Sequence, residues 1–249
     1  MNKYNFTKIN QFKMELDSFR PLPKEIVANI HENLIINWTY HSNAIEGNTL
    51  TINETKVVLE GITVGGKSLR EHFEAINHKE AILFLEDLIS DKQELSEGVI
   101  KNIHSLILKN IDNSNAGKYR SINVRISGAE HVPSNHVLLA EQMNNLIEQY
   151  KSWSNLHPVK QAAMLHSEFV KIHPFVDGNG RTSRLLMNLA LMQNGYPPAI
   201  LPVSKRLRYY NALDKAHVKN EYDDFINLII EIVEESFEPY WFALGINDA

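Results

Sequence analysis

Cysteine is absent from this sequence, and so is any long apolar run. The first absence excludes a disulfide framework, a thiolate zinc site and a cysteine nucleophile. No stretch approaches the roughly 18 apolar residues of a membrane-spanning helix, and the first residues, MNKYNFTKINQF, lack the apolar segment of a signal peptide. The net charge of −5 gives no indication of general nucleic-acid binding. We therefore expect a cytoplasmic protein that binds neither nucleic acid nor membranes.

Apolar residues recur at helical spacing along most of the 249 residues, and Thr51 and Ser68 each open a helix with a capping box. One segment departs from this period, because Ile122, Val124 and Ile126 alternate with polar residues as in a strand. A turn follows at Gly128. We predict an all-helical fold with a single β-hairpin. A small structural hairpin is the alternative to a functional one.

The segment from His173 to Arg184, HPFVDGNGRTSR, carries the chemistry. Two glycines around an asparagine allow backbone N–H groups to converge on an anion. The next helix begins at about Arg181, so its positive end points at the same place. Arg181 and Arg184 lie three apart and share a helix face. We interpret this combination as a polyphosphate site.

Two further residues extend this interpretation. Asp177 can hold Mg²⁺, which binds through one carboxylate together with substrate phosphates. His173 can accept a proton near neutral pH. The site therefore predicts cleavage or transfer of a phosphate group. Each feature also occurs without function, since Asn-Gly loops and solvated arginines are common at helix starts; their combination in twelve positions argues for function.

The segment resembles the signature of the Fic-domain family, HPFx(D/E)GNGRxxR, and matches every fixed position. The similarity extends through roughly residues 40–235 and is strongest with the autoinhibited branch that includes the animal endoplasmic-reticulum Fic protein. The fold implied is the Fic fold, in which the hairpin is a flap over the active site. The implied division is an N-terminal helical region, 1–66, and a Fic core, 67–249, with the flap at about 119–132.

Residues 42–47, SNAIEG, resemble the inhibitory motif of that branch, (S/T)xxxE(G/N). The resemblance implies that Ser42 and Glu46 belong to the inhibitory segment and that Glu46 pairs with Arg184. An arginine held by a carboxylate cannot also bind the γ-phosphate of ATP. From the residues alone, 42–47 is an ordinary helix end with a glutamate that the helix dipole disfavours.

The resemblance also assigns the remaining site residues. His173 is the general base, Asp177 the Mg²⁺ ligand, and the flap is expected to align a target segment by strand addition. Tyr209 and Tyr210 are expected to line the adenine pocket, one buried and one exposed. His217 stands where the animal protein has an asparagine that contacts nucleotide, so that contact is in doubt. The expected nucleotide-binding residues are Asp177, Gly178, Asn179, Gly180, Arg181, Thr182, Ser183, Arg184, Gly128, Ala129, Glu130, His131, Tyr209 and Tyr210.

The activity implied is transfer of AMP from ATP to a Ser, Thr or Tyr hydroxyl of a target protein, with Mg²⁺ as cofactor and with repression by Glu46. The presence of Gly180 favours nucleotidyl transfer over phosphate transfer, although UTP or another nucleotide is not excluded. Two alternatives stay open: a hydrolase that removes AMP in the same site, and a nucleotide-sensing interaction protein with little activity. The partners expected are ATP and an unidentified target protein, with self-modification and a homodimer both open.

Overall fold

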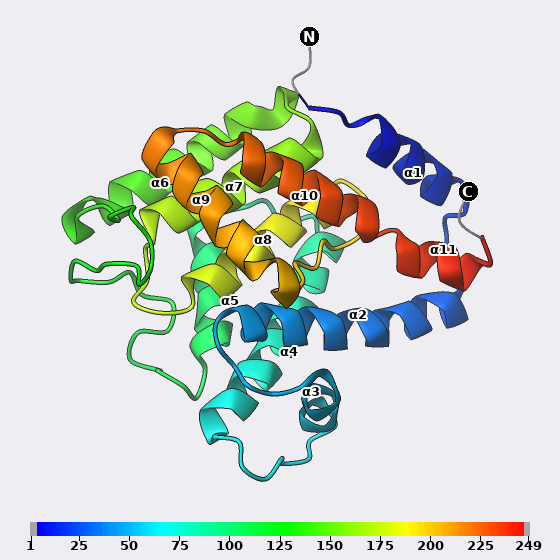
Figure 1. Cartoon of the computed structure of the whole chain (residues 1–249), viewed down its shortest axis with the longest axis horizontal. Helices are drawn as coiled ribbons and strands as arrows, with labels where there is room; N and C mark the ends of the chain where they lie inside the picture. Colours follow the sequence, from blue (N-terminus) through cyan, green and yellow to red (C-terminus); the bar gives the residue numbers. More distant parts are fainter. Residues whose placement is uncertain (1–3, 247–249) are drawn as a thin grey trace.

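Helices make up the regular structure of the protein, and a computed structural model describes residues 4–246 of it (Figure 1). None of the helices in this range is long and apolar enough to cross a membrane. The predicted all-helical class is confirmed. The helices are α1 (Thr7–Ser18), α2 (Lys24–Ile45), α3 (Ile52–Leu59), α4 (Leu69–Ser90), α5 (Glu97–Leu108), α6 (Leu139–Ser152), α7 (Pro158–Ile172), α8 (Asn179–Gln193), α9 (Arg206–Lys219), α10 (Asp223–Glu235) and α11 (Glu238–Leu244), with short 3-10 turns at His136–Leu138, Trp153–Asn155 and Val203–Lys205.

Local sequence explains where several of these helices begin. Thr51 and Ser68 form the two predicted capping boxes, each accepting a hydrogen bond from the backbone of the glutamate three residues later. Pro158 occupies the first position of α7, where a missing N–H group costs nothing. The starts of these three helices therefore follow from residues that are local in the sequence.

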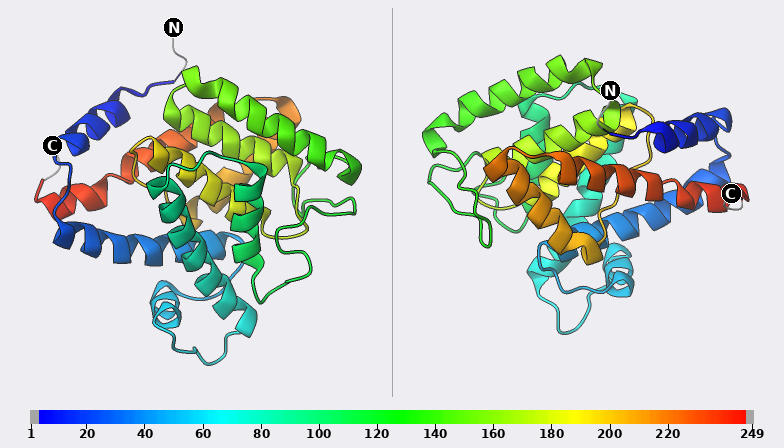
Figure 2. Two further views of the ribbon diagram at one scale, coloured as in Figure 1. Left: turned by 180° about the vertical axis from the view of Figure 1, so that it is seen from behind. Right: turned by 45° about the horizontal axis from the view of Figure 1, so that its top comes forward.

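Helix α8 is the centre of the fold. It packs against α7 along its length and also meets α2, α4 and α5 (Figures 1 and 2). Its second half supplies apolar residues to the core, whereas its first turns bury polar side chains. The buried polar residues of α8 are Asn179, Arg181, Thr182, Ser183, Arg184 and Asn188. Burying polar groups without partners is costly, so this end of α8 is the place to look for function.

Helix α2 runs across one side of the molecule and ends beside the start of α8 (Figure 1). Its residues Ile35, Trp38 and Ile45 join the same core as residues of α8 and α10, and so do Ile9 and Leu16 of α1. The two predicted regions, 1–66 and 67–249, thus share one core, and their division stays a prediction. Their outermost residues, 1–3 and 247–249, lie outside the described range.

The predicted β-hairpin is not formed, because no strand occurs anywhere within residues 4–246. The segment from 119 to 133 is extended with a turn, and side chains take up its backbone groups. The Arg120 guanidinium donates to the carbonyls of Ile122 and Ser134, at 2.7 Å each. The amide oxygen of Asn123 accepts the backbone N–H of His136 at 2.9 Å. Strand alternation in the sequence did not reveal these competing side chains.

Candidate active site

The loop between α7 and α8 is bounded by two residues in left-handed conformations. His173 ends α7 with φ 52°, and Gly178 precedes α8 with φ 77°. Asn179 then fixes the loop, since its amide accepts the N–H of Phe175 at 3.0 Å and donates to the Phe175 carbonyl at 2.9 Å. The Asn179 side chain is therefore occupied within the loop. Only its backbone is available to the predicted nucleotide.

Two residues outside the signature brace the same loop. The ring of His104 stacks on Phe175 at 3.5 Å, and its Nε2 donates to the carbonyl of Asp177 at 2.9 Å. Burial lowers the pKa of His104 to about 4, so its ring is neutral at pH 7. Arg120 donates through Nε to the carbonyl of His173 at 2.9 Å. From the sequence, His104 is expected to be a packed or a surface histidine, and its contact with the loop is not predicted.

Backbone N–H groups converge at the start of α8. Thr182 N–H bonds to the carbonyl of Gly178 at 2.9 Å and closes the first turn. The N–H groups of Asn179, Gly180 and Arg181 precede this bond and have no hydrogen-bond partner among residues 4–246. Such a set, at the positive end of a helix, binds anions.

A carboxylate from another helix already lies at this position. Glu46, the residue that ends α2, accepts a hydrogen bond from Arg184 Nη2 at 2.7 Å. Arg184 also donates to the Ser42 hydroxyl at 3.0 Å and to the Ser42 carbonyl at 2.7 Å. Its side chain is 3% exposed, and that of Glu46 is 32% exposed. Burial lowers the pKa of Arg184, but Glu46 together with Tyr209 and Tyr210 outweighs this effect and keeps that pKa above its usual value.

The carboxylate of Glu46 also requires the absence of a side chain at Gly180. A Cβ atom at Gly180 would lie 2.1 Å from Glu46 Oε1 and 3.2 Å from Arg184 Nη1. Gly180 has ordinary helical geometry, so its backbone conformation does not demand glycine. The glycine instead gives space for an anion directly above the first turn of α8.

The second arginine of the signature, Arg181, has a different set of neighbours. Its Nη2 lies 3.3 Å from Asp177 Oδ1, and its Nη1 lies 3.3 Å from Glu74 Oε1 of α4. The side chain is 2% exposed, and its Nε and Nη1 groups make no hydrogen bond. A buried donor without a partner costs about 1–3 kcal/mol. An incoming acceptor such as a phosphate oxygen would remove that cost.

Arg70 and Glu74 complete this side of the site, and sequence analysis missed both. Arg70 Nη2 donates to Asp177 Oδ2 at 2.6 Å, and Arg70 Nε donates to Glu74 Oε1 at 3.1 Å. Asn48, just beyond the end of α2, donates to Glu74 Oε2 at 2.9 Å. The available signal was a cation in the first turn of a predicted helix, where the dipole disfavours it.

His173 is largely buried beside the loop. Burial lowers its pKa to about 4, and the nearby Arg120 lowers it further, against an opposing effect of Glu46. The imidazole is therefore neutral across the physiological range and able to accept a proton. The negative charge of Glu46 opposes the lowering of the His173 pKa.

Asp177 is suited to one kind of metal site. No group of three or more His, Asp or Glu side chains that could hold a metal occurs in the described range. Burial raises the pKa of Asp177, but Arg181, the Gly178 N–H and Arg70 outweigh burial and keep that pKa below its usual value. The carboxylate is thus ionised and 41% exposed. It fits Mg²⁺ that is otherwise bound by substrate phosphates.

The other predicted contacts divide into exposed and buried groups. Tyr209 is 1% exposed and Tyr210 is 38% exposed, as predicted for the pair. The Tyr210 hydroxyl donates to the carbonyl of Ile45 at 3.2 Å, next to Glu46. Thr182 and Ser183 are fully buried, and the Ser183 hydroxyl donates to the carbonyl of Gly180 at 2.8 Å. Their side chains face the core, so nucleotide contact through them has no support in the geometry.

The turn that carries Gly128 and Ala129 is fastened to α9. The Asp214 carboxylate accepts the N–H of Glu130 at 3.0 Å and the N–H of His131 at 3.1 Å. The His131 ring bonds to the carbonyl of Lys171 in α7 at 2.9 Å. The segment thus bridges α7 and α9 next to the loop, although it is not a paired hairpin.

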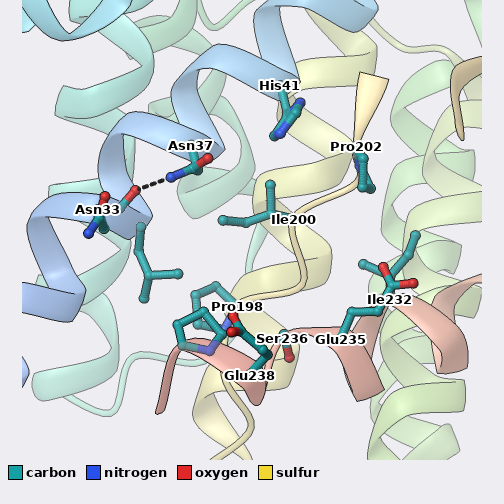
Figure 3. Close-up of a pocket in the computed structure, with 12 residues that line it drawn as sticks. Asn33, Asn37, His41, Pro198, Ile200, Pro202, Ile232, Glu235, Ser236 and Glu238 are labelled. Carbon is teal, nitrogen blue, oxygen red and sulfur yellow. Dashed lines mark hydrogen bonds between the residues drawn. The ribbon is translucent and has the colours of Figure 1, made fainter. Parts of the chain in front are cut away.

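A separate cavity of about 320 Å³ lies beside α2, away from the signature loop (Figure 3). Asn33, Asn37 and His41 line it from α2, and the Asn37 amide bonds back to the carbonyl of Asn33 at 2.9 Å (Figure 3). Pro198 and Ile232 lie among the residues opposite. None of the signature residues lines this cavity, so it is distinct from the anion site.

These features define a helical domain with an anion-binding loop at the start of its central helix. A model of the Fic/DOC family matches residues 94–191. The protein adenylyltransferase Fic of Drosophila virilis is 39% identical over 211 residues, which are 82% of this chain and 42% of that protein. The protein adenylyltransferase fic-1 of Caenorhabditis elegans is 39% identical over 210 residues, 82% of this chain and 40% of that protein. The chain spans about two fifths of the length of these curated relatives.

Solved structures agree with this match. A fragment of C. elegans Fic-1 superposes with a TM-score of 0.86 and 33% identity, over 96% of this chain and 72% of the fragment. A Fic domain-containing signalling protein of Bacteroides thetaiotaomicron superposes with a TM-score of 0.89 and 28% identity, over 98% of this chain and all of that one. This chain belongs to the Fic/DOC family.

Proposed function

We propose that the protein transfers AMP from ATP to a Ser, Thr or Tyr hydroxyl of a target protein and that Glu46 represses this transfer. The relatives in Drosophila and Caenorhabditis are named protein adenylyltransferases, which supports the reaction class. The observation that carries the proposal is the Glu46 carboxylate, which lies 2.7 Å from Arg184 and over Gly180. A carboxylate there takes the position that a terminal phosphate would need.

The reaction follows from the groups around the loop. Neutral His173 takes the proton of the target hydroxyl, and the oxygen attacks the α-phosphorus of ATP. The bond from the α-phosphorus to the bridging oxygen breaks, and pyrophosphate leaves with that electron pair. The N–H groups of Asn179 and Gly180 stabilise the charge on the phosphate oxygens, and the unpaired donors of Arg181 stabilise the leaving group. With Glu46 displaced, Arg184 binds the γ-phosphate and orients the triphosphate of ATP.

Asp177 would hold the Mg²⁺ that accompanies the nucleotide. Held there, the metal would supply positive charge that offsets the charge of the substrate phosphates. The protein's own contribution is to keep this carboxylate ionised and oriented through Arg181 and the N–H of Gly178. The single carboxylate, without a second acid ligand, fits a metal that arrives with the nucleotide.

The contacts at the edges of the site complete the proposal. The Tyr210 ring is accessible for stacking on adenine, and the segment from Gly128 to His131 covers the nucleotide and aligns the target. Strand addition would have to use the backbone groups of residues 119–133 that are not already bound by side chains such as Arg120 and Asp214. We further propose a cytoplasmic location, with self-modification and a homodimer as assemblies to be tested.

Hydrolytic removal of AMP from a modified protein is the second candidate. The observation in its favour is that the Glu46 carboxylate is partly exposed and electrostatically coupled to His173. In that reaction Glu46 would orient a water for attack on the phosphorus. The two candidates therefore require opposite effects of removing Glu46.

Labelled ATP with Mg²⁺ distinguishes these activities in the wild type and in Glu46→Gly. Charged hydrogen bonds are worth about 1.5–3 kcal/mol, so we expect roughly 10- to 150-fold more labelling without the glutamate. The matched control is Glu60→Gly, because Glu60 also ends a helix with φ −81° and precedes a glycine. We expect Glu60→Gly to label like the wild type.

Three other outcomes have distinct meanings. AMP release from a labelled target by the wild type, lost in Glu46→Gly, would support the hydrolase. ATP binding without labelling in any variant would favour a nucleotide-sensing interaction protein. Equal labelling by the wild type and Glu46→Gly would contradict repression by Glu46.

A further inference from the structure

Arg70 is a charged residue in an unfavourable position. It is the second residue of α4, where the helix dipole favours acidic side chains, and Glu71 and Ser68 already form the capping box beside it. Its guanidinium leaves the helix and reaches the signature loop, 107 residues further along the chain. A cation that is disfavoured by its own helix and bound by a distant loop indicates a role in that loop.

The partner that Arg70 holds is the proposed metal ligand. Asp177 Oδ1 accepts the Gly178 N–H at 2.6 Å and lies 3.3 Å from Arg181 Nη2. Asp177 Oδ2 accepts Arg70 Nη2 at 2.6 Å. One oxygen is thus fixed by the loop itself, and the other is bound by a residue of α4. A divalent cation at Oδ2 and the guanidinium would be two positive charges on a single oxygen, which repel each other.

We propose that Arg70 is a positioning residue that occupies the carboxylate of Asp177 in the absence of nucleotide and must yield it when Mg²⁺ arrives. This inference rests on the proposed function, since it needs a metal-bound nucleotide in the loop. Glu74 gives the displaced guanidinium a place to remain, because it already accepts Arg70 Nε at 3.1 Å. Asp177 keeps its orientation after the exchange through Gly178 and Arg181.

The expected effect is modest because the pair is accessible to water. Arg70 is 57% exposed and Asp177 is 41% exposed. Exposed ion pairs contribute about 0.2–1 kcal/mol, which corresponds to roughly a 1.4- to 5-fold change in an equilibrium constant. Removal of Arg70 should therefore tighten metal binding by about that factor. The gain should shrink as salt is added, because salt already weakens the pair in the unmodified protein.

The test measures Mn²⁺ binding by water-proton relaxation in the presence of a non-hydrolysable ATP analogue. Both proteins carry Glu46→Gly so that the triphosphate is admitted, and one also carries Arg70→Ala. We expect tighter Mn²⁺ binding in Arg70→Ala, an intermediate value in Arg70→Lys, and convergence in high salt. Arg208→Ala is the matched control, since Arg208 makes a 2.6 Å ion pair with Glu231 at exposures of 52% and 39%. It should leave Mn²⁺ binding unchanged.

Each other result overturns the inference. Unchanged Mn²⁺ affinity in a folded Arg70→Ala protein would mean that the ion pair has no influence on the metal. Weaker Mn²⁺ binding would mean that Arg70 contacts the nucleotide instead of competing with the metal. If Mn²⁺ and the analogue fail to bind every variant, including the Arg208→Ala control, the proposed function falls as well.

Discussion

The two arginines at the start of α8 lie three positions apart, yet their surroundings differ. Arg184 makes three hydrogen bonds of 2.7 to 3.0 Å, all to Ser42 and Glu46 of the α2 end. Arg181 has only 3.3 Å contacts with Glu74 and Asp177, and its Nε and Nη1 groups make no hydrogen bond. On one side of the loop the protein supplies its own anion. On the other side two donors are unpaired, whereas Arg184 has one, its Nη1.

This difference suggests how the site can be folded and inactive at once. Three guanidiniums, of Arg70, Arg181 and Arg184, are balanced by the three carboxylates of Glu46, Glu74 and Asp177. Buried charges need such partners, because an unpaired buried charge is costly. Glu46 is the partner whose replacement would leave the loop and its metal ligand intact.

The largest effect on labelling should come from His173, which is outside the contacts of both Arg181 and Arg184. In the Glu46→Gly background, His173→Ala removes the proposed base while leaving the contacts of Arg181 and Arg184 unchanged. General-base catalysis contributes about 10²–10⁴-fold, so labelling should fall by that factor. Binding of ATP, followed by calorimetry, should stay within a factor of a few. Equal labelling rates with and without the imidazole would remove His173 from the mechanism.

The substitution Gly180→Ala tests the position of Glu46 through the free energy of unfolding. Its Cβ would lie 2.1 Å from Glu46 Oε1, so Gly180→Ala must displace the carboxylate from Arg184. We expect a loss of about 1–3 kcal/mol in the free energy of unfolding. In the Glu46→Gly background the clash with the carboxylate is removed, and only the 3.2 Å approach to Arg184 Nη1 remains. The higher helix propensity of alanine, worth up to about 1 kcal/mol, opposes that crowding, so we expect a much smaller loss. Urea denaturation of the four proteins measures both values.

The difference between the losses in the two backgrounds is the decisive feature of that cycle. A strained backbone at Gly180 would destabilise both backgrounds equally, whereas a clash with Glu46 depends on the glutamate. Equal losses in the two backgrounds would show that Glu46 is not seated over Gly180 in solution.

The pH dependence of labelling tests whether the base is a buried, neutral His173. Burial lowers the pKa of His173 to about 4, and Glu46 opposes this shift. Labelling by Glu46→Gly should therefore stay level from pH 8 to pH 5.5, where a histidine of ordinary pKa near 6.5 would lose about tenfold. A tenfold decline by pH 5.5, with ATP still saturating, would contradict a buried neutral base.

The same lowered pKa predicts a direction for stability. Between about pH 4 and pH 6.5 the unfolded chain binds a proton at His173 that the folded chain does not, so stability rises with pH across this window. The stability is fully present above pH 6.5 and declines as the pH falls toward 4. In urea titrations at pH 7 and pH 5, His173→Ala should lose less stability on acidification than the unmodified protein.

Much of this arrangement was predictable from the sequence, for identifiable reasons. The capping boxes at Thr51 and Ser68 are local, so the helix starts followed directly, and the helix expected to open at Ser68 is α4, Leu69–Ser90. The signature supplied the loop because its glycines and arginines are adjacent in the chain. The Glu46–Arg184 contact, between residues 138 apart, came from the family resemblance and not from periodicity.

What the sequence did not reveal depends on contacts between distant segments. Arg70 reaches Asp177 and Asp214 reaches the backbone of Glu130, and no local pattern encodes either pair. The alternation at Ile122–Ile126 predicted strands because it depends only on which residues are apolar. The side chains of Arg120 and Asn123 bind backbone groups that the hydrogen bonds of a hairpin would use. Similarly, Thr182 falls within the signature, yet its helical position turns it into the core.

The smallest effect should come from Tyr210, which links the proposed adenine pocket to the end of α2. Its hydroxyl donates to the carbonyl of Ile45 at 3.2 Å, one residue before Glu46. Tyr210→Phe keeps the aromatic ring and removes this bond, worth about 0.5–1.5 kcal/mol, so labelling should rise roughly 2- to 12-fold. In Glu46→Gly the same substitution should have no effect, because no carboxylate remains for the hydroxyl to hold in place. A rise in labelling in both backgrounds would instead assign Tyr210 to nucleotide binding alone. Faster hydrogen exchange at residues 42–47 in Tyr210→Phe than in the unmodified protein would show that the hydroxyl restrains the segment that carries Glu46.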